Sequence, residues 1–187
     1  EHLMAALSGL GIDNLIVELD GKEVPILDGS AATFVDAFDQ VGLETQPVKR
    51  RYIRVLKPVR IENGASWAEF RPYTGTRFEV EIDFENPAIG RQAYAADMDA
   101  ETFRRDIARA RTFGFMKDVE RLWAAGFALG ASLDNSVVIG DDSKIINAEV
   151  DIALTRWRCS ACCRIAPRLN LSRRAAANVV AVLISWP

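Results

Sequence analysis

The chain has 187 residues, of which 49% are hydrophobic and 26% are charged, and its formal net charge is -3 at pH 7. This length allows one large domain or two small ones, and the composition is that of a folded globular protein rather than a disordered one. No stretch approaches the roughly 20 consecutive apolar residues of a membrane-spanning helix, and no basic segment leads into an apolar one at the start. We therefore expect a cytoplasmic protein without stable insertion into a membrane.

Charge and cysteine content divide the sequence near Val150. From Val150 onward there are six Arg, no Lys and one acidic residue, a local charge of +5 that leaves -8 for residues 1–149. The three cysteines also lie in this tail, at Cys159, Cys162 and Cys163. No disulfide framework can therefore hold the first 149 residues together.

The first part of the chain predicts two helices and a strand. Apolar residues from Leu3 to Leu10 follow the spacing of a helix with one buried face, which Gly11 ends. Residues 15–19 are rich in β-branched and apolar types and predict a strand. Asp28-Gly29-Ser30 then precedes a helix over about 31–41, whose first amide groups Ser30 or Asp28 can cap. This setting favours a turn or a cap for Asp28 over metal binding.

A polar segment over 45–51, which contains Pro47, predicts a linker between two domains. The elements predicted beyond it are strands over 52–59, 65–71 and 76–84, helices over 99–110 and 118–125, and a strand over 136–139. We expect the first three of these strands to form an antiparallel meander. Runs of strands with interspersed helices indicate an α+β fold rather than a parallel α/β sheet.

The tail over 150–187 has neither helical nor strand periodicity. Its enrichment in Arg, Ala and Cys is typical of GC-rich DNA translated in a shifted frame, and we interpret it so; a natural basic tail is the alternative. One Cys-x-x-Cys pair is only half of a structural zinc site, so we expect no zinc there. Nor do we expect a nucleic-acid partner, since these arginines lack a folded face.

Two short blocks carry candidate chemistry. Glu1-His2-Leu3 places a carboxylate beside the single histidine of the chain, at the start of the first predicted helix. A Glu adjacent to a metal-ligating His is well placed to act as a general base on metal-bound water. The second block is the run Arg-Ala-Arg-Thr-Phe-Gly-Phe-Met over 109–116. Taken alone, the His is more often structural, and the aromatic residues of the second block are more simply the core of a strand end.

Taken together, the two blocks resemble UDP-3-O-acyl-N-acetylglucosamine deacetylase, the zinc amidase family of lipid A biosynthesis. The resemblance runs from Glu1 to about Asn147 and also rests on the segments Ala5-Ala6-Leu7, Gly11-Ile12-Asp13-Asn14, Pro25 and Asp28-Gly29-Ser30-Ala31-Ala32. It implies an α+β fold of two domains, each a two-layer sandwich of antiparallel sheet and helices, which we expect to be incomplete at both ends of this chain.

The resemblance also implies a domain organisation. The predicted parts are the C-terminal half of the first α+β domain (1–44), the linker (45–51), the second α+β domain (52–149) with a hydrophobic acyl-chain insert (about 114–134), and a basic, Cys-containing tail that does not match the family (150–187).

Site residues follow from the same resemblance. His2 is expected to bind Zn²⁺, Glu1 to act in catalysis as the general base, and Thr112 to stabilise the oxyanion. The substrate-binding residues implied are Phe113 at the sugar and Val119, Leu122, Gly130 and Ser132 in or near the hydrophobic passage for the acyl chain. The substrate implied is UDP-3-O-acyl-N-acetylglucosamine, a precursor of lipopolysaccharide, and we expect a monomer.

Two hypotheses for function remain open. In the family, a later helix bears a His and an Asp as further zinc ligands and another His is the general acid, whereas this chain has no histidine after His2. The first hypothesis is a zinc-dependent deacetylase that removes the N-acetyl group, here in partial or frame-shifted form. The second is a catalytically inactive fragment that retains at most acyl-chain or sugar-nucleotide binding.

Overall fold

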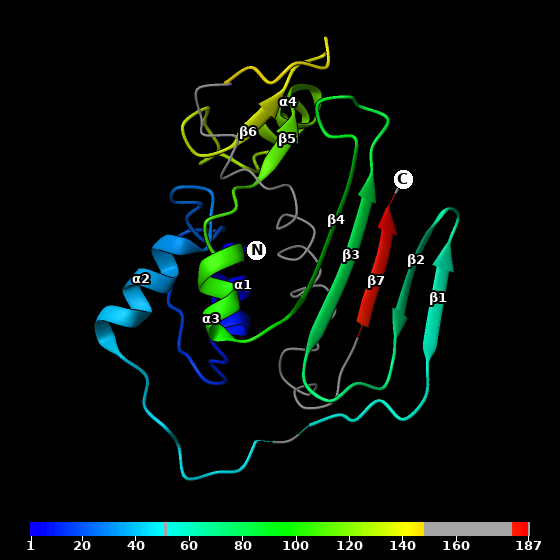
Figure 1. The fold of residues 1–187 in the computed structure, drawn as a ribbon. Helices are drawn as coiled ribbons and strands as arrows, with labels where there is room; N and C mark the ends of the chain where they lie inside the picture. The colour runs from blue at the N-terminus through cyan, green and yellow to red at the C-terminus, as the bar shows by residue number, and fades with distance from the viewer. Residues whose placement is uncertain (51, 148–180, 187) are drawn as a thin grey trace.

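The computed structural model describes residues 1–50, 52–147 and 181–186, the last as backbone (Figure 1). Its elements in chain order are α1 (His2–Gly9), α2 (Ala32–Val41), β1 (Val59–Asn63), β2 (Ser66–Phe70), β3 (Arg77–Asp83), β4 (Arg91–Asp97), α3 (Ala100–Thr102), the π-helical turn η1 (Phe103–Ile107), β5 (Phe113–Phe115), α4 (Met116–Ala124), β6 (Val137–Ile139) and β7 (Ala181–Trp186). This mixture of helices and small sheets confirms the α+β class. No helix in the described part of the chain is long and apolar enough to cross a membrane.

Five strands form the larger sheet, in the order β1-β2-β7-β3-β4. The pairs β1–β2 and β3–β4 are antiparallel hairpins, while β7 is antiparallel to β2 and parallel to β3. The predicted continuous meander is therefore wrong, because β7 separates its second and third strands (Figure 1). That strand comes from the tail, where the sequence pattern predicts no element.

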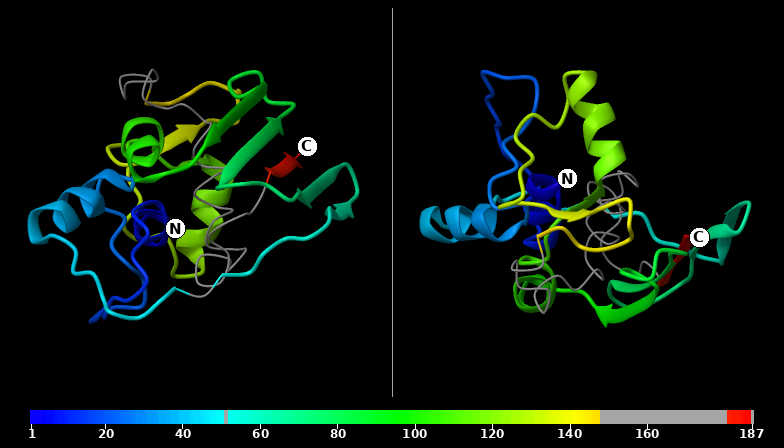
Figure 2. Two further views of the ribbon diagram at one scale, coloured as in Figure 1. Left: turned by 60° about the horizontal axis from the view of Figure 1, so that its bottom comes forward. Right: turned by 90° about the horizontal axis from the view of Figure 1, so that it is seen from above.

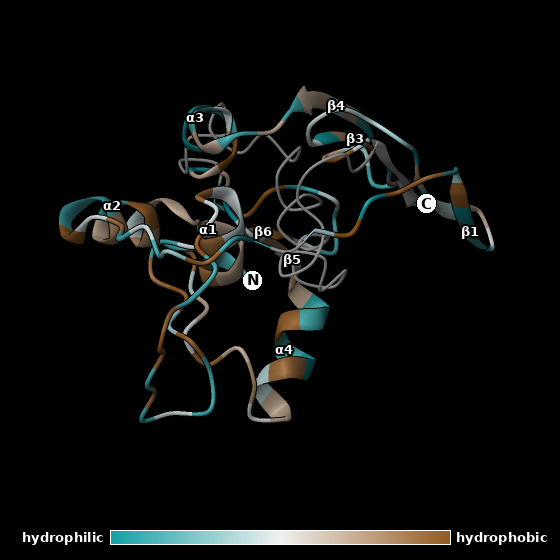
Figure 3. Cartoon of the chain, turned by 90° about the horizontal axis from the view of Figure 1, so that it is seen from below, coloured by the Kyte–Doolittle hydropathy of each residue, from teal (hydrophilic) through white to brown (hydrophobic). Residues whose placement is uncertain are grey.

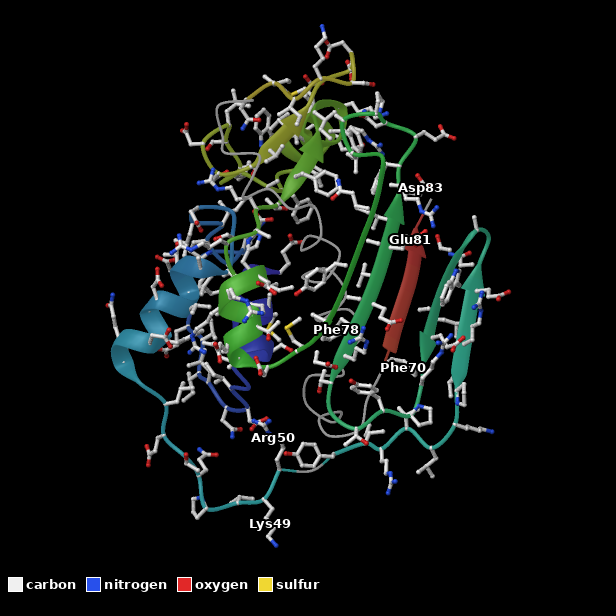
Figure 4. All side chains as sticks on the ribbon, viewed as in Figure 1. Lys49, Arg50, Phe70, Phe78, Glu81 and Asp83 are labelled. Carbon is white, nitrogen blue, oxygen red and sulfur yellow. The ribbon has the colours of Figure 1, made fainter. Side chains whose placement is uncertain are left out.

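Strand β3, which lies between β7 and β4, shows why one face of this sheet is apolar. Val80 and Ile82 are buried in the core, whereas Glu79 and Glu81 alternate with them and form ion pairs with Arg77 and Arg91 on the other face. Figure 4 labels Phe78 and Glu81, which lie on these opposite faces. The side-chain period of two thus assigns each residue of β3 to the core or to solvent.

The core joins the helices to the sheet through small residues. Ala5 and Ala6 of α1 are buried with Val35 of α2, and Phe103 of η1 packs in the same cluster. A Cβ atom on Gly9 would lie 2.2 Å from the Phe103 ring, so only glycine allows this approach of α1 to η1. The close packing of α1 and η1 thus depends on a residue without a side chain.

Several predicted elements are confirmed with shifted ends, namely α1, α2, α4 and β6. The strand predicted over 15–19 is wrong: these residues form no strand, and Ile16 is 88% exposed. A strand is stabilised by hydrogen bonds to a neighbour, and no described strand pairs with this segment. Strong β-propensity alone is therefore not sufficient here.

The region after the predicted linker also differs from expectation. The strand predicted over 52–59 is almost wholly wrong, because β1 begins only at Val59. The helix predicted over 99–110 is reduced to α3 and the wider turn η1. Strand β4 was not predicted, because alanines at three of its seven positions weaken its β-propensity, and its pairing with β3 decides its conformation.

The segment before residue 51 is tied back to the first part of the chain. Arg50 Nε donates to Asp13 Oδ2 at 2.7 Å, and Arg50 Nη2 donates to the carbonyl oxygen of Gly11 at 2.6 Å (Figure 4). Asn14 Nδ2 donates to Gln46 Oε1 at 2.8 Å. The linker over 45–51 and the domain limits drawn from it stay predictions.

Candidate active site

His2 is buried at the start of α1, with 8% of its surface exposed. Its Nε2 atom makes no hydrogen bond within the described residues, and Oε1 of Glu1 lies 3.4 Å away. A buried nitrogen without a partner costs about 1–3 kcal/mol of stability, so such atoms are uncommon in folded proteins. The sequence places a candidate ligand here, and its Nε2 atom lies near the Glu1 carboxylate without a hydrogen bond from the described residues.

The donors around His2 do not amount to a complete metal site. A catalytic zinc site uses three protein ligands. Among the residues that the structure describes, no group of three His, Cys, Asp or Glu side chains is placed to hold a metal ion. His2 is also the single histidine of the chain. It therefore fits as one ligand, but the described donor set does not fit a catalytic metal ion; the three cysteines lie outside the described residues.

Thr112 lies where three segments that are distant in sequence meet. Its N–H donates to the carbonyl oxygen of Gly29 at 2.8 Å, and its own carbonyl accepts from the N–H of Val137 at 3.0 Å. Strand β5 then begins at Phe113, opposite Val137 of β6. We call the contact of residues 28–30, 111–112 and 134–137 the Thr112 junction. In Figures 1 and 3 the N-terminus lies near the start of β5.

Gly29 is the closest contact in the Thr112 junction. Its φ angle is +77°, in the left-handed region, and a Cβ atom there would lie 1.6 Å from the carbonyl oxygen of Asn135. No side chain larger than hydrogen fits at this distance. The backbone of the Asp28–Ser30 turn is thus in direct contact with the chain segment that leads into β6.

Asp28 and Ser30 hold this turn in place. The buried Ser30 hydroxyl lies 2.8 and 3.0 Å from the two carboxylate oxygens of Asp28 and accepts from the N–H of Ala32 at 3.1 Å, which confirms the predicted role in the start of α2. Thr33 Oγ1 donates to Asp28 as well, at 3.1 Å. Asp28 is therefore a turn residue, as predicted, and its carboxylate accepts hydrogen bonds from Ser30 and Thr33.

The environment of Asp28 also sets its charge state. Burial would raise the pKa of this carboxyl, but the hydrogen bonds from Ser30 and Thr33 and the charge of Arg111 outweigh burial and hold the pKa below its usual value. Arg111 Nη1 donates to the carbonyl oxygen of Asp134 at 3.2 Å. Arg111 therefore contacts Asp134 in one segment of the Thr112 junction and stabilises the negative charge of Asp28 in another.

Phe113 is half-buried and belongs to an aromatic cluster. Its ring centroid lies 6.0 Å from that of Phe84 and 6.4 Å from that of Phe115, both with edge-to-face geometry. The cluster packs on the hydrophobic core. The structure thus places Phe113 at the margin of the core, and its predicted role at the sugar stays a prediction.

The predicted acyl-chain residues lie on α4 and the loop after it. Val119 is half-buried, with its Cγ2 atom 3.3 Å from the Cβ position of Gly114, whereas Leu122 is exposed. Trp123, Phe127 and Leu129 are also exposed, the last by 70%. Figure 3 shows α4 standing away from the body of the molecule with apolar residues among polar ones.

Gly130 and Ser132 have different surroundings from α4. The Cβ position of Gly130 lies 3.2 Å from Ile26 Cγ2, so the loop rests on the segment before Asp28. Figure 2 (right) shows this segment and α4 projecting on the same side of the molecule. Ser132 Oγ accepts from the N–H of Asp134 at 3.2 Å, and its N–H donates to Asn135 Oδ1 at 2.8 Å. Its hydroxyl is thus engaged in a local turn.

Two asparagines that we did not predict organise this region. Asn135 Nδ2 donates to the carbonyl oxygen of Gly130 at 2.9 Å, and Asn147 Nδ2 donates to those of Leu133 and Ser136 at 2.6 and 2.7 Å. Asn147 Oδ1 also accepts from the N–H of Val138 at 3.1 Å. The only sequence signal for either is an Asn beside a predicted strand, which is typical of many turns.

Comparison with known proteins bears directly on this arrangement. The family model described as LpxC: UDP-3-O-acyl N-acetylglycosamine deacetylase matches residues 1–153. The chain belongs to the LpxC family. The matched range contains the Glu1-His2 pair, the Thr112 junction and α4 with its loop, so the predicted resemblance is confirmed. The LpxC family is a family of metalloenzymes.

Relatives in the LpxC family are similar over most of this chain. It is 71% identical over 149 residues to the UDP-3-O-acyl-N-acetylglucosamine deacetylases of Brucella ovis, Brucella canis and Brucella suis, an alignment that covers 80% of this chain and 52% of each relative. The chain thus spans about half the length of the curated relatives that it matches. Activity, substrate and partners of those proteins are therefore matters of proposal for this one.

Proposed function

We propose that this chain carries the site of a zinc-dependent deacetylase, which hydrolyses the N-acetyl group of UDP-3-O-acyl-N-acetylglucosamine in lipid A biosynthesis. We further propose that it acts in the cytoplasm as a monomer and has no nucleic-acid partner. The observation that carries the proposal is the buried Nε2 atom of His2, which has no hydrogen bond within the described residues and lies 3.4 Å from Glu1 Oε1, in a chain of the LpxC family.

The catalytic roles are assigned to the chain's own side chains. His2 would contribute one ligand to a zinc ion, which would supply an acidic water molecule near neutral pH. Glu1 lies beside that ligand and takes the proton of the attacking water as general base. The Thr112 hydroxyl donates a hydrogen bond to the oxygen of the substrate amide. This oxygen becomes negatively charged as the carbonyl carbon becomes tetrahedral.

Substrate binding is assigned to Phe113 and the α4 region. Phe113, at the margin of the aromatic cluster, contacts the sugar. Val119 and Leu122, with Gly130 and Ser132 in the loop, border the acyl chain. Burial of an acyl chain against exposed apolar side chains such as Leu129 stabilises the complex by about 0.8 kcal/mol for each methylene group.

Zinc content and acetate release of the purified 187-residue chain test this proposal. The proposal requires that the parent chain hold zinc and release acetate, and that His2→Leu lose both. Glu1→Gln should keep zinc and lose at least about 10²-fold in rate, because it removes the base. Glu18→Gln, which neutralises an exposed carboxylate, is the matched control and should behave as the parent. A parent chain that neither binds zinc nor releases acetate contradicts the proposal.

A second candidate function is supported by the incomplete donor set. With no group of three metal-binding side chains among the described residues, the chain would be a non-catalytic fragment that binds an acyl chain or a sugar nucleotide at most. In that case a fluorescent fatty acyl probe should bind the parent chain without acetate release, and Leu122→Ser should weaken its binding. Equal binding by Leu122→Ser would exclude α4 as the binding surface.

A further inference from the structure

We propose that the Asp28–Ser30 turn positions Thr112 for catalysis, so that Asp28, Gly29 and Ser30 are positioning residues of the reaction. This inference rests on the proposed function, because it takes the Thr112 hydroxyl as the donor to the developing oxyanion. The geometry that points to it is the pair of hydrogen bonds that fixes the Thr112 backbone between the turn and β6.

The Thr112 backbone is held on both sides. Gly29 accepts from its N–H at 2.8 Å and Val137 donates to its carbonyl at 3.0 Å. A residue fixed at both groups has little freedom in φ and ψ, and a β-branched side chain is then restricted at χ1. The two backbone bonds therefore limit the directions in which the Thr112 hydroxyl can point.

The Gly29 carbonyl, which accepts from the Thr112 amide, is itself held in place. The Cβ position of Gly29 lies 1.6 Å from the Asn135 carbonyl oxygen, so the turn is in contact with the chain that enters β6. On its other side, Ser30 is fully buried and its hydroxyl is shared between Asp28 and the N–H of Ala32. The Gly29 carbonyl is thus fixed from two directions, by α2 and by β6.

The Thr112 side chain is half-buried and carries the hydroxyl that would act on the substrate. Within the part of the chain that the structure describes, no hydrogen bond uses this hydroxyl. The junction thus orients Thr112 through its backbone and leaves the hydroxyl for a ligand. Oxyanion stabilisation requires a donor held about 2.7–3.1 Å from the developing charge, so a small displacement of Thr112 reduces the rate.

Ser30→Ala tests the inference, because it removes the hydroxyl that links Asp28 to α2. We expect kcat for acetate release to fall roughly tenfold with KM unchanged, and deuterium exchange at the Thr112 amide to become faster. In a Thr112→Ala background the same substitution should cause no further loss of kcat, because the donor that it positions is gone.

Asp28→Asn is the second variant, for the case in which Ser30→Ala does not fold as judged by circular dichroism. It should lower kcat in the same direction. Asp99→Asn is the matched control, because Asp99 also accepts from an amide at a helix start, that of Thr102 at 2.7 Å, away from the Thr112 junction. This control should leave kcat and KM unchanged.

The outcomes separate the two proposals. If the parent chain releases no acetate, the proposed function is overturned, and the positioning role falls with it. If the parent is active but Ser30→Ala and Asp28→Asn lower kcat equally in the Thr112→Ala background, or only raise KM, the positioning role alone is overturned. A kcat effect that disappears in the Thr112→Ala background, together with an unaffected Asp99→Asn, supports it.

Discussion

Helix α4 and the loop after it (residues 116–133, the α4 segment) lie in the chain between two of the three segments of the Thr112 junction, but the two regions differ in burial. In the junction Ser30 is fully buried and its hydroxyl has partners, and Ile139 of the adjoining β6 is fully buried as well. In the α4 segment Phe127 and Leu129 expose 52% and 70% of their surface. Both regions lie within the range matched by the LpxC family.

This difference in burial indicates that substitutions in the two regions should affect different properties of the protein. Residues of the Thr112 junction are fixed by contacts inside the protein, so their substitution should change stability. Apolar residues of the α4 segment such as Phe127 and Leu129 keep more than half of their surface exposed, so their substitution should change ligand binding more than stability. Measurements of stability and of acyl-chain binding on matched variants can therefore separate the two regions.

The largest effect is expected from Gly29→Ala. Its methyl group would lie 1.6 Å from the Asn135 carbonyl oxygen at a φ angle of +77°, so the turn or β6 must move. We expect a loss of about 4 kcal/mol or more in the free energy of unfolding, measured with urea. Gly64→Ala is the control, because Gly64 also has a positive φ, +61°, but its Cβ position meets no atom within 4 Å. It should cost only about 1 kcal/mol, and equal losses would contradict the close contact.

The next largest effect compares two apolar truncations. Ile139→Ala removes a fully buried side chain from the core and should cost about 3 kcal/mol. Leu129→Ala truncates a side chain that is 70% exposed and should change stability by less than about 0.5 kcal/mol. Urea unfolding measures both, and a large loss in Leu129→Ala would mean that the loop after α4 is packed in solution.

The elements that the sequence predicted well are those whose signals are local. The helical spacing from Leu3 to Leu10 and the Asp28-Gly29-Ser30 sequence gave α1 and α2, and the apolar run at β6 gave a strand. Strand β7, the pairing of β4 and the lack of a strand over 15–19 depend on partners elsewhere in the chain, so local propensity could not predict them.

The same contrast between local signals and long-range contacts applies to the residues of the candidate site. Residue type and order were sufficient to propose Glu1, His2 and Thr112, through the resemblance to the family. The acceptor of the Thr112 amide, the contact of Gly29 with Asn135 and the hydrogen bonds of Asn147 result from chain segments that meet in the fold. No spacing in the sequence encodes which segments meet.

His2 is buried like the residues of the Thr112 junction, but its Nε2 has no hydrogen bond within the described residues. His2→Leu replaces a buried polar ring by an apolar side chain of similar size. In the presence of a chelator we expect the stability to be unchanged or to rise by about 1 kcal/mol, since no hydrogen bond of Nε2 is lost. A loss of more than about 2 kcal/mol on urea unfolding would show that His2 is structural.

The smallest effect concerns the pH dependence of the Thr112 junction. Since hydrogen bonds and Arg111 hold the pKa of Asp28 below its usual value despite burial, its carboxylate stabilises the fold above the pKa of the unfolded chain. That contribution is lost as the pH falls through the lower pKa of the folded state.

Asp28→Asn cannot titrate, so the difference in unfolding free energy between parent and variant should be largest at pH 7 and should shrink in acid below about pH 4. Asp39 also has a lowered pKa, because it accepts from Arg104, and its loss in acid affects parent and variant equally. Urea unfolding of both chains across this range therefore isolates Asp28, and a difference independent of pH would mean that its charge does not stabilise the junction.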